Sequence, residues 1–284
     1  MHAPVVFMPQ AWGPFATPGL APSVRAMDQS ARCRFYARDE ESFGYLSGAV
    51  GPGSISSEIS PDVAFTFRSS SSKRVSEILQ GVGWRRERPL VAIAPNTRAY
   101  SRTRGTGLEN EHLSGLMRAA HVAIHELGAD VLLQANEIRT DASRADDRHL
   151  CRLLHSALGR PERCFFHPGY LSAEDSAGLI GACELLLGSR FHSLVFGLSQ
   201  GVACVAVGWS HKYRELLKPF GLQDMVVDVY ALSQADTADL LRKAWAGRAA
   251  ARRRILPIVD GYRHKNARLF DEVAALLSGA RCGQ

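Results

Sequence analysis

The chain has 284 residues, of which 46% are hydrophobic and 22% charged, as in a soluble globular protein with one large or two ordinary domains. Its net charge of +6 favours an anionic partner, but no dense basic tract with interleaved aromatic residues occurs, which argues against nucleic acid. No apolar stretch approaches the roughly 20 residues of a membrane-spanning helix. The first residues also lack the features of a secretory signal, so a cytoplasmic protein is expected.

The first 72 residues predict a small α/β lobe. Strands are expected at residues 5–8, 33–37 and 59–67, and helices at residues 21–31 and 39–46. A strand that begins at residue 5 looks like an interior strand whose partners are missing, so this lobe is expected to be truncated. The serine-rich run at residues 68–73 is the clearest break in composition and predicts a linker. We therefore expect a partial N-terminal lobe at residues 1–72 and a C-terminal lobe with terminal helices at residues 73–284.

Strands alternate with helices through the rest of the chain. Strands are expected at residues 90–94, 131–134, 163–167, 185–187, 202–207 and 225–229, and helices at 75–82, 113–127, 148–158, 172–183, 189–200 and 232–277, the last interrupted at Pro257. This alternation predicts a parallel sheet covered on both faces. The predicted fold class is α/β, with two Rossmann-like lobes that each contain a parallel sheet.

Polar residues follow three strands of the C-terminal lobe. Asn96 follows the first strand, Arg190 and His192 follow the fourth, and Lys212 follows the fifth. Ligands bind outside the carboxyl ends of the strands in open parallel sheets. Two cations and an imidazole at such ends predict a site for a small anion with acid–base chemistry.

The cysteines and the remaining histidines do not predict a metal site. No two of the six cysteines form a CxxC pair, and those at 164, 183 and 204 lie in apolar runs, which favours buried reduced thiols over a disulfide framework. His121 and His125 are four residues apart but lack the acidic partner of an H-E-x-x-H motif, so they are expected at the surface. No G-x-G-x-x-G dinucleotide loop or P-loop occurs either.

Four segments, in the same order, resemble motifs of the polysaccharide pyruvyl transferase family. They are PQAWGPF from Pro9, YARDEESFGYL from Tyr36, SPDVAFTF from Ser60, and GSRFHSLVFGLSQGVACVAVGWSHKYRELLKPFGL from Gly188. The R-x-H motif alone is weak, but four motifs in order are fairly specific. The resemblance implies a two-lobed, GT-B-like fold. It also implies transfer of the enolpyruvyl group of phosphoenolpyruvate to sugar hydroxyls, giving a pyruvate ketal.

The resemblance also assigns roles to individual residues. His192 matches the catalytic histidine of the family, Arg190 is the arginine of R-x-H, and Arg38 and Lys212 match basic residues of its site. Phosphoenolpyruvate is then the donor substrate, with no separate cofactor or metal. The acceptor is a saccharide, free or lipid-linked, which is compatible with a cytoplasmic protein or with peripheral association at the inner face of the membrane.

The sequence departs from the family pattern in two places. Family members have further strands and a glycine-rich loop before the G-P-F motif, whereas this sequence begins just before that motif. Trp209 stands where many members have tyrosine. The first departure leaves acceptor binding open and keeps an inactive, truncated relative as an alternative. A nucleotide-sugar glycosyltransferase of the same two-lobed architecture is the second alternative, because fold analogy alone does not separate the two activities.

Each predicted site residue also has a structural interpretation. Asn96 suits a helix cap, His192 and Lys212 suit exposed helix starts, Arg190 suits an ion pair with an acid such as Glu184 or Asp175, and Arg38 suits a surface pair with Glu41.

Overall fold

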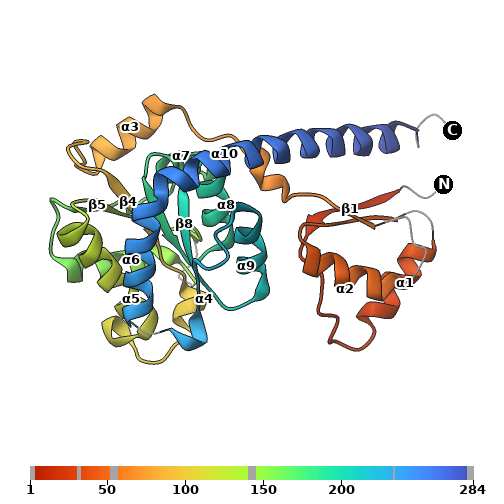
Figure 1. Cartoon of the computed structure of the whole chain (residues 1–284), viewed down its shortest axis with the longest axis horizontal. Coiled ribbons are helices and arrows are strands. Elements are labelled where there is room, and N and C mark those ends of the chain that lie inside the picture. The colour runs from red at the N-terminus through yellow and green to blue at the C-terminus, as the bar shows by residue number, and fades with distance from the viewer. Residues whose placement is uncertain (1–3, 31–32, 52–56, 140–144, 233, 280–284) are drawn as a thin grey trace. The chain divides into compact units, whose positions relative to one another are not determined.

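The computed structural model describes residues 4–30, 33–51, 57–139, 145–232 and 234–279 (Figure 1). The chain divides into two compact units: unit 1 comprises Met1–Thr66 and Asp260–Gln284, and unit 2 comprises Phe67–Val259. The division after Thr66 lies close to the boundary expected after residue 72. The last residues differ from the expected arrangement, because the chain from Asp260 onward groups with unit 1 and not with the C-terminal lobe.

Unit 1 contains a three-stranded parallel sheet in the order β1–β2–β3. Its elements are β1 (Val5–Gln10), α1 (Leu20–Gln29), β2 (Cys33–Ala37), α2 (Glu40–Val50), β3 (Ser57–Ile59) and the 3₁₀ turn η1 (Val63–Thr66). Each strand pairs with the next strand in the sequence, and a helix connects each pair. Asp39 caps α2 as expected, since its carboxylate accepts a hydrogen bond of 2.7 Å from the Ser42 amide.

The strand expected at residues 59–67 is wrong beyond its first residue. Pro61 has no amide hydrogen to give to a strand ladder. The Asp62 carboxylate then accepts a 3.0 Å hydrogen bond from the Ala64 amide, which favours a tight turn over an extended chain. The apolar residues of this motif therefore form η1.

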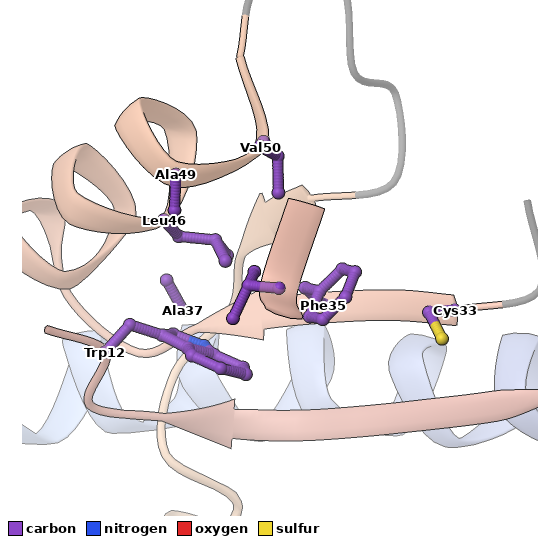
Figure 2. Close-up of a cluster of buried hydrophobic side chains, with 8 residues drawn as sticks. Trp12, Cys33, Phe35, Ala37, Leu46, Ala49 and Val50 are labelled. Atoms are coloured by element: carbon purple, nitrogen blue, oxygen red, sulfur yellow. The ribbon is translucent and has the colours of Figure 1, made fainter. Parts of the chain in front are cut away.

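The core of unit 1 lies between the sheet and its helices. The buried cluster consists of Trp12, Val24, Cys33, Phe35, Ala37, Leu46, Ala49 and Val50 (Figure 2). Cys33, Phe35 and Ala37 are alternate residues of β2, so their side chains share one face of the strand. The Trp12 indole donates a 3.1 Å hydrogen bond to the Tyr36 carbonyl, which fixes the loop of the PQAWGPF motif on β2.

Unit 2 contains a six-stranded parallel sheet in the order β6–β5–β4–β7–β8–β9. Its strands are β4 (Leu90–Ala94), β5 (Asp130–Leu133), β6 (Cys164–Phe166), β7 (Leu185–Gly188), β8 (Ala203–Gly208) and β9 (Val226–Asp228). Its helices are α3 (Ser72–Gly81), α4 (Thr97–Tyr100), α5 (Glu111–His121), α6 (Asp147–Leu158), α7 (Ala173–Gly181), α8 (Phe191–Ser199) and α9 (His211–Leu217). Its shorter segments are the 3₁₀ turns η2 (Gly107–Glu109), η4 (Lys218–Phe220) and η5 (Val229–Ala231) and the π-helical η3 (Val122–Glu126), which follows α5 directly. Every strand expected in this part of the chain is present.

The order of the strands fixes where a ligand would bind in unit 2. All residues of β4, β5, β7 and β8 are buried, as their continuous apolar runs predict for the centre of a parallel sheet. Successive strands run outward from β4 to β6 in one direction and from β7 to β9 in the other, so the order reverses between β4 and β7. Such a switch point opens a crevice at the carboxyl ends of the two strands.

The last helix, α10, runs without a break from Gln234 to Gly279. The interruption expected at Pro257 is wrong. Pro257 is exposed, and so is Arg253, whose carbonyl loses its helical hydrogen bond. Ile255 and Val259, on either side of it, are fully buried and hold the helix in place. Within the described ranges, no helix combines the length and the apolar character needed to cross a membrane.

Candidate active site

The candidate site lies where the carboxyl ends of β4, β7 and β8 come together. The carbonyl oxygen of Ser189, directly after β7, accepts a 2.6 Å hydrogen bond from the Asn96 amide, which follows β4. The same oxygen accepts a 3.0 Å hydrogen bond from the Tyr213 hydroxyl on α9, which follows β8. Three segments that are far apart in the sequence are therefore fixed to one peptide group at the switch point.

Two glycines allow these segments to approach one another closely. A Cβ atom on Gly188 would lie 3.0 Å from Ser193 Oγ and 3.1 Å from Leu194 Cδ2. A Cβ atom on Gly208 would lie 2.4 Å from the ring of Tyr213. At position 208 only glycine therefore leaves room for the Tyr213 ring, and at position 188 a side chain would press on the first turn of α8.

Asn96 is buried and has both ends of its amide engaged. Its side-chain oxygen accepts a 2.8 Å hydrogen bond from the Arg98 amide and so caps α4, while its nitrogen donates to Ser189. The side chain is only 1% exposed. The structural interpretation of Asn96 as a helix cap is confirmed, and a direct contact with substrate stays a prediction.

Arg190 is bound to acidic side chains of unit 2. Its Nε and Nη2 atoms donate to Asp147, at 2.9 and 2.7 Å, and Nη1 lies 2.5 Å from a Glu137 oxygen. Nη2 also donates to Thr97 at 3.1 Å. Asp147 is fully buried. The ion pair considered from the sequence is present, but its partners are Asp147 and Glu137 and not Glu184 or Asp175.

The charges of this network stabilise each other. Burial alone would lower the pKa of Arg190, but its hydrogen bonds to Asp147 and the negative charges of Asp147 and Glu137 raise that pKa. Burial likewise works to raise the pKa of Glu137, but Arg190 and Arg139 hold it below its usual value. The arginine of the R-x-H motif thus anchors the turn that leads into α8. A contact between Arg190 and the donor stays a prediction.

His192 and Lys212 both lie beside the ring of Phe191. His192 is exposed at the second position of α8, and its ring packs edge-on against Phe191, with 5.7 Å between the ring centroids. The Lys212 ammonium lies 5.8 Å from the centroid of the same Phe191 ring. The structure therefore brings together the imidazole and the lysine that the sequence placed after two different strands.

The Lys212 ammonium lies among aromatic rings. Besides Phe191, it is 5.7 Å from the centroid of Trp209 and 5.4 Å from that of Tyr213. These distances are within the range of cation–π attraction, which holds the ammonium at the carboxyl end of β8. Trp209, the residue that departs from the family pattern, therefore still supplies an aromatic face beside Lys212.

A buried histidine supports the turn after β7 from behind. His112 Nε2 lies 3.3 Å from Ser189 Oγ, and that hydroxyl donates a 3.2 Å hydrogen bond to the Ala94 carbonyl. While the hydroxyl donates to Ala94, it can accept a hydrogen bond from His112 only in the neutral tautomer that carries its proton on Nε2. Burial lowers the pKa of His112 to about 3, in agreement with a neutral ring.

Arg38 belongs to unit 1, whereas the other four predicted site residues belong to unit 2. Its Nη1 atom forms a 2.9 Å ion pair with Asp62, so the R-D and P-D motifs meet directly. Asp39 lies 3.8 Å from Nε. Glu41, the surface partner considered from the sequence, accepts a hydrogen bond from Tyr45. A role for Arg38 in donor binding stays a prediction.

Five of the six cysteines lie away from solvent. Those at 33, 151, 164, 183 and 204 are buried with free thiols, and Cys282 lies outside the described residues. Burial raises the pKa of Cys164 to about 12, so this thiol stays protonated at neutral pH. In the part of the chain that the structure describes, no group of three or more histidine, cysteine, aspartate or glutamate side chains is arranged to hold a metal ion.

Three residues beside the predicted site were not singled out from the sequence. Asp147 looks like an ordinary acid in the first turn of a helix, and Tyr213 looks like an apolar residue of α9. Arg102 lies in the arginine-rich loop after β4, where a solvated side chain is the default expectation, yet its guanidinium carbon lies 4.9 Å from the centroid of the Trp209 ring. The position of this loop after a central strand was the one available signal.

Comparison with known proteins identifies the same family as the four sequence motifs. The family model described as polysaccharide pyruvyl transferase matches residues 1–211. The amylovoran biosynthesis protein AmsJ of Erwinia amylovora is 26% identical to this chain over 110 residues, and this alignment covers 39% of the chain but only 26% of AmsJ.

Solved structures with a similar fold are glycosyltransferases of the GT-B class. The UDP-forming α,α-trehalose-phosphate synthase of Burkholderia vietnamiensis has a TM-score of 0.54 at 13% identity and is matched over 98% of this chain and 70% of that one. The corresponding synthase of Burkholderia xenovorans has a TM-score of 0.56 at 12% identity, over 97% of this chain and 68% of that one. At such low identity the likeness concerns the fold alone, and it confirms the expected α/β, GT-B-like class.

Proposed function

Because the chain belongs to the polysaccharide pyruvyl transferase family, we propose that it transfers the enolpyruvyl group of phosphoenolpyruvate to a saccharide and forms a pyruvate ketal. One observation carries this proposal beyond the family match. His192 and Lys212, which come from different helices, lie on the same Phe191 ring at the carboxyl edge of the sheet in unit 2. An acid–base group and a cation thus both lie next to one aromatic ring, at the edge of the sheet where a small anion would bind.

The proposed reaction needs both kinds of residue. Phosphoenolpyruvate carries a carboxylate and a phosphate, so fixed cations such as Lys212 are needed to bind it. His192 donates a proton to the methylene carbon, which makes the adjacent C2 atom electrophilic. A sugar hydroxyl then attacks C2, and the neutral imidazole takes up the hydroxyl proton.

The ketal is completed by loss of phosphate. The bond between C2 and the phosphate oxygen breaks, and the electron pair leaves with the phosphate. A second hydroxyl of the same sugar adds to C2, and its proton leaves with the inorganic phosphate. One proton has then moved to the new methyl group and one to the phosphate, so the two hydroxyl protons are accounted for. His192 returns to its starting state.

The acceptor in this proposal is a polysaccharide or its precursor. AmsJ is a protein of amylovoran biosynthesis, which supports a saccharide acceptor for a related chain. An acceptor carried on a lipid would place the reaction at the inner face of the membrane.

Ligand-dependent thermal stability of the full chain tests the proposal against the glycosyltransferase alternative. Phosphoenolpyruvate should raise the melting temperature, because a ligand that binds only the folded state at about 100 times its Kd stabilises that state by about 2.7 kcal/mol. UDP and GDP at the same concentration should have no such effect. Stabilisation by UDP alone would favour a nucleotide-sugar transferase, and no response to any of the three would contradict a donor site of either kind.

A further inference from the structure

Arg102 is an exposed arginine in the loop that follows β4. Its guanidinium lies on the Trp209 ring, 4.9 Å from the centroid. Its Nη1 atom donates a 3.2 Å hydrogen bond to the Arg98 carbonyl, which keeps the side chain over its own helical turn. Among the residues that the structure describes, no carboxylate pairs with Arg102. The guanidinium is therefore held in a fixed place without a counter-charge.

A second cation shares the same ring. The Lys212 ammonium lies 5.7 Å from the Trp209 centroid, so one indole attracts two positive charges. Two cations gathered on one ring repel each other unless an anion lies between or beside them. The buried acid of this region, Asp147, is occupied by Arg190. An anion from outside the chain is the natural partner for Arg102, beside the Lys212 ammonium.

The way Arg102 is held leaves its hydrogen-bond donors available. Stacking on an indole uses the face of the guanidinium, whereas its five N–H groups lie in the plane. One of them is engaged by the Arg98 carbonyl. The remaining donors match the paired oxygens of a phosphate or carboxylate, which Arg binds bidentately. The loop that carries Arg102 follows β4, and Trp209 follows β8, so this pair belongs to the same carboxyl edge as His192.

We propose that Arg102 is a donor-binding residue that binds the phosphate group of the donor together with Lys212, with Trp209 holding both cations in place. This inference rests on the function proposed above. The phosphate is the more highly charged end of phosphoenolpyruvate, at about −2 near neutral pH, and two cations match it better than the singly charged carboxylate. Inorganic phosphate, the leaving group of the reaction, should bind at the same place.

The test compares Arg102→Gln with Arg104→Gln in the full chain. Arg104 is an exposed arginine two positions further along the same loop, and its side chain makes no hydrogen bond or ion pair with the described residues. Arg102→Gln should raise the KM for phosphoenolpyruvate about tenfold or more, because it removes a charge-assisted bidentate contact. It should weaken inhibition by inorganic phosphate by a similar factor and leave inhibition by pyruvate within about twofold. Arg104→Gln should behave as the wild type.

The outcomes separate this inference from the proposed function. Wild-type protein that binds no phosphoenolpyruvate would overturn the proposed function itself. Wild-type protein that binds it, together with an Arg102→Gln variant of unchanged KM and unchanged phosphate inhibition, would overturn only the role of Arg102. A variant that loses affinity for pyruvate but not for phosphate would overturn the assignment to the phosphate end. Thermal unfolding of both variants without ligand shows whether either substitution has disturbed the fold.

Discussion

At the residue scale, the site combines an exposed imidazole with side chains that are fully engaged within the protein. His192 is exposed on α8, whereas Asn96 is 1% exposed and bound at both ends of its amide. His112 supports the same turn as a neutral, buried ring. The two histidines of this region are therefore suited to different tasks, His192 to proton transfer and His112 to positioning.

We expect His192→Ala to lower turnover by roughly 10² to 10⁴, the usual contribution of general acid–base catalysis, and to leave donor affinity within a few-fold. The imidazole is proposed to act on the methylene carbon and not to hold the charged groups of the donor. Steady-state kinetics together with equilibrium binding of phosphoenolpyruvate measure both quantities. His121→Ala, which removes an exposed histidine of α5, serves as the matched control. A His192→Ala variant with near wild-type turnover would disprove the assignment.

His112 predicts a specific dependence of stability on pH. Its pKa falls from an ordinary 6.5 to about 3 in the folded state, so between these values the unfolded chain binds a proton that the folded chain does not. The ionisation of His112 therefore does not change the free energy of unfolding above pH 6.5. Between pH 6.5 and about pH 3 it lowers that free energy by about 1.4 kcal/mol for each pH unit. Urea unfolding at pH 7, 6 and 5 measures how the free energy of unfolding changes with pH. His112→Gln should remove the part of this change that His112 contributes.

His149→Gln is the control for that experiment, because His149 is an exposed histidine of α6. The glutamine at position 112 retains an N–H donor for the Ser189 hydroxyl, so the variant should fold. If the free energy of unfolding changes equally with pH in the wild type and in His112→Gln, the ring does not stay neutral in the folded chain.

At the element scale, the start of α8 is fixed by contacts from β4, α6 and α9. Asn96 and Tyr213 bind the Ser189 carbonyl, and Asp147 at the first position of α6 binds Arg190. The Asp147 carboxylate also accepts hydrogen bonds from the amides of Thr97, at 3.0 Å, and Glu137, at 2.9 Å. One buried carboxylate thus joins the loops after β4, β5 and β7.

Asp147→Asn should destabilise unit 2 by about 3 kcal/mol, since breaking a buried ion pair leaves the partner charge without compensation. Turnover should fall as well, because the turn that carries His192 loses its anchor. Chemical denaturation and steady-state kinetics measure the two effects. Asp239→Asn removes an acid of the exposed pair with Arg242 and should change stability by at most about 1 kcal/mol. Equal effects of the two substitutions would contradict the structural role of Asp147.

At the scale of the whole molecule, the sequence predicts the strands of unit 2 well because they are buried on both faces. Runs such as Leu90–Ala94 and Ala203–Gly208 are apolar at every position or nearly so, and such runs bounded by turn residues have few other interpretations. The motif residues His192 and Lys212 were likewise found by their place after two such strands. Their common contact with Phe191 required the structure, because it depends on the direction of α8.

The features that the sequence did not predict depend on contacts between distant residues, or on side chains that bind nearby backbone groups and so disfavour a strand. The Asp147–Arg190 pair joins positions 43 residues apart, and nothing in the first turn of α6 distinguishes this acid from a helix-stabilising one. Asp62 turned an expected strand into a turn through a bond to its own backbone neighbour. Helical periodicity predicted a helix through most of α10. The periodicity does not indicate whether the part of α10 from Asp260 onward belongs to unit 1 or to unit 2.

The double hydrogen bond to the Ser189 carbonyl has an electronic consequence for the residue that follows. Both lone pairs of that oxygen are engaged, at 2.6 and 3.0 Å, so electron density in the peptide group is drawn towards it. The nitrogen of the same peptide group belongs to Arg190, and its N–H becomes a stronger donor, because hydrogen bonds in a chain polarise one another. The two hydrogen bonds to the Ser189 carbonyl therefore also increase the positive potential at the start of α8, at the amide of Arg190.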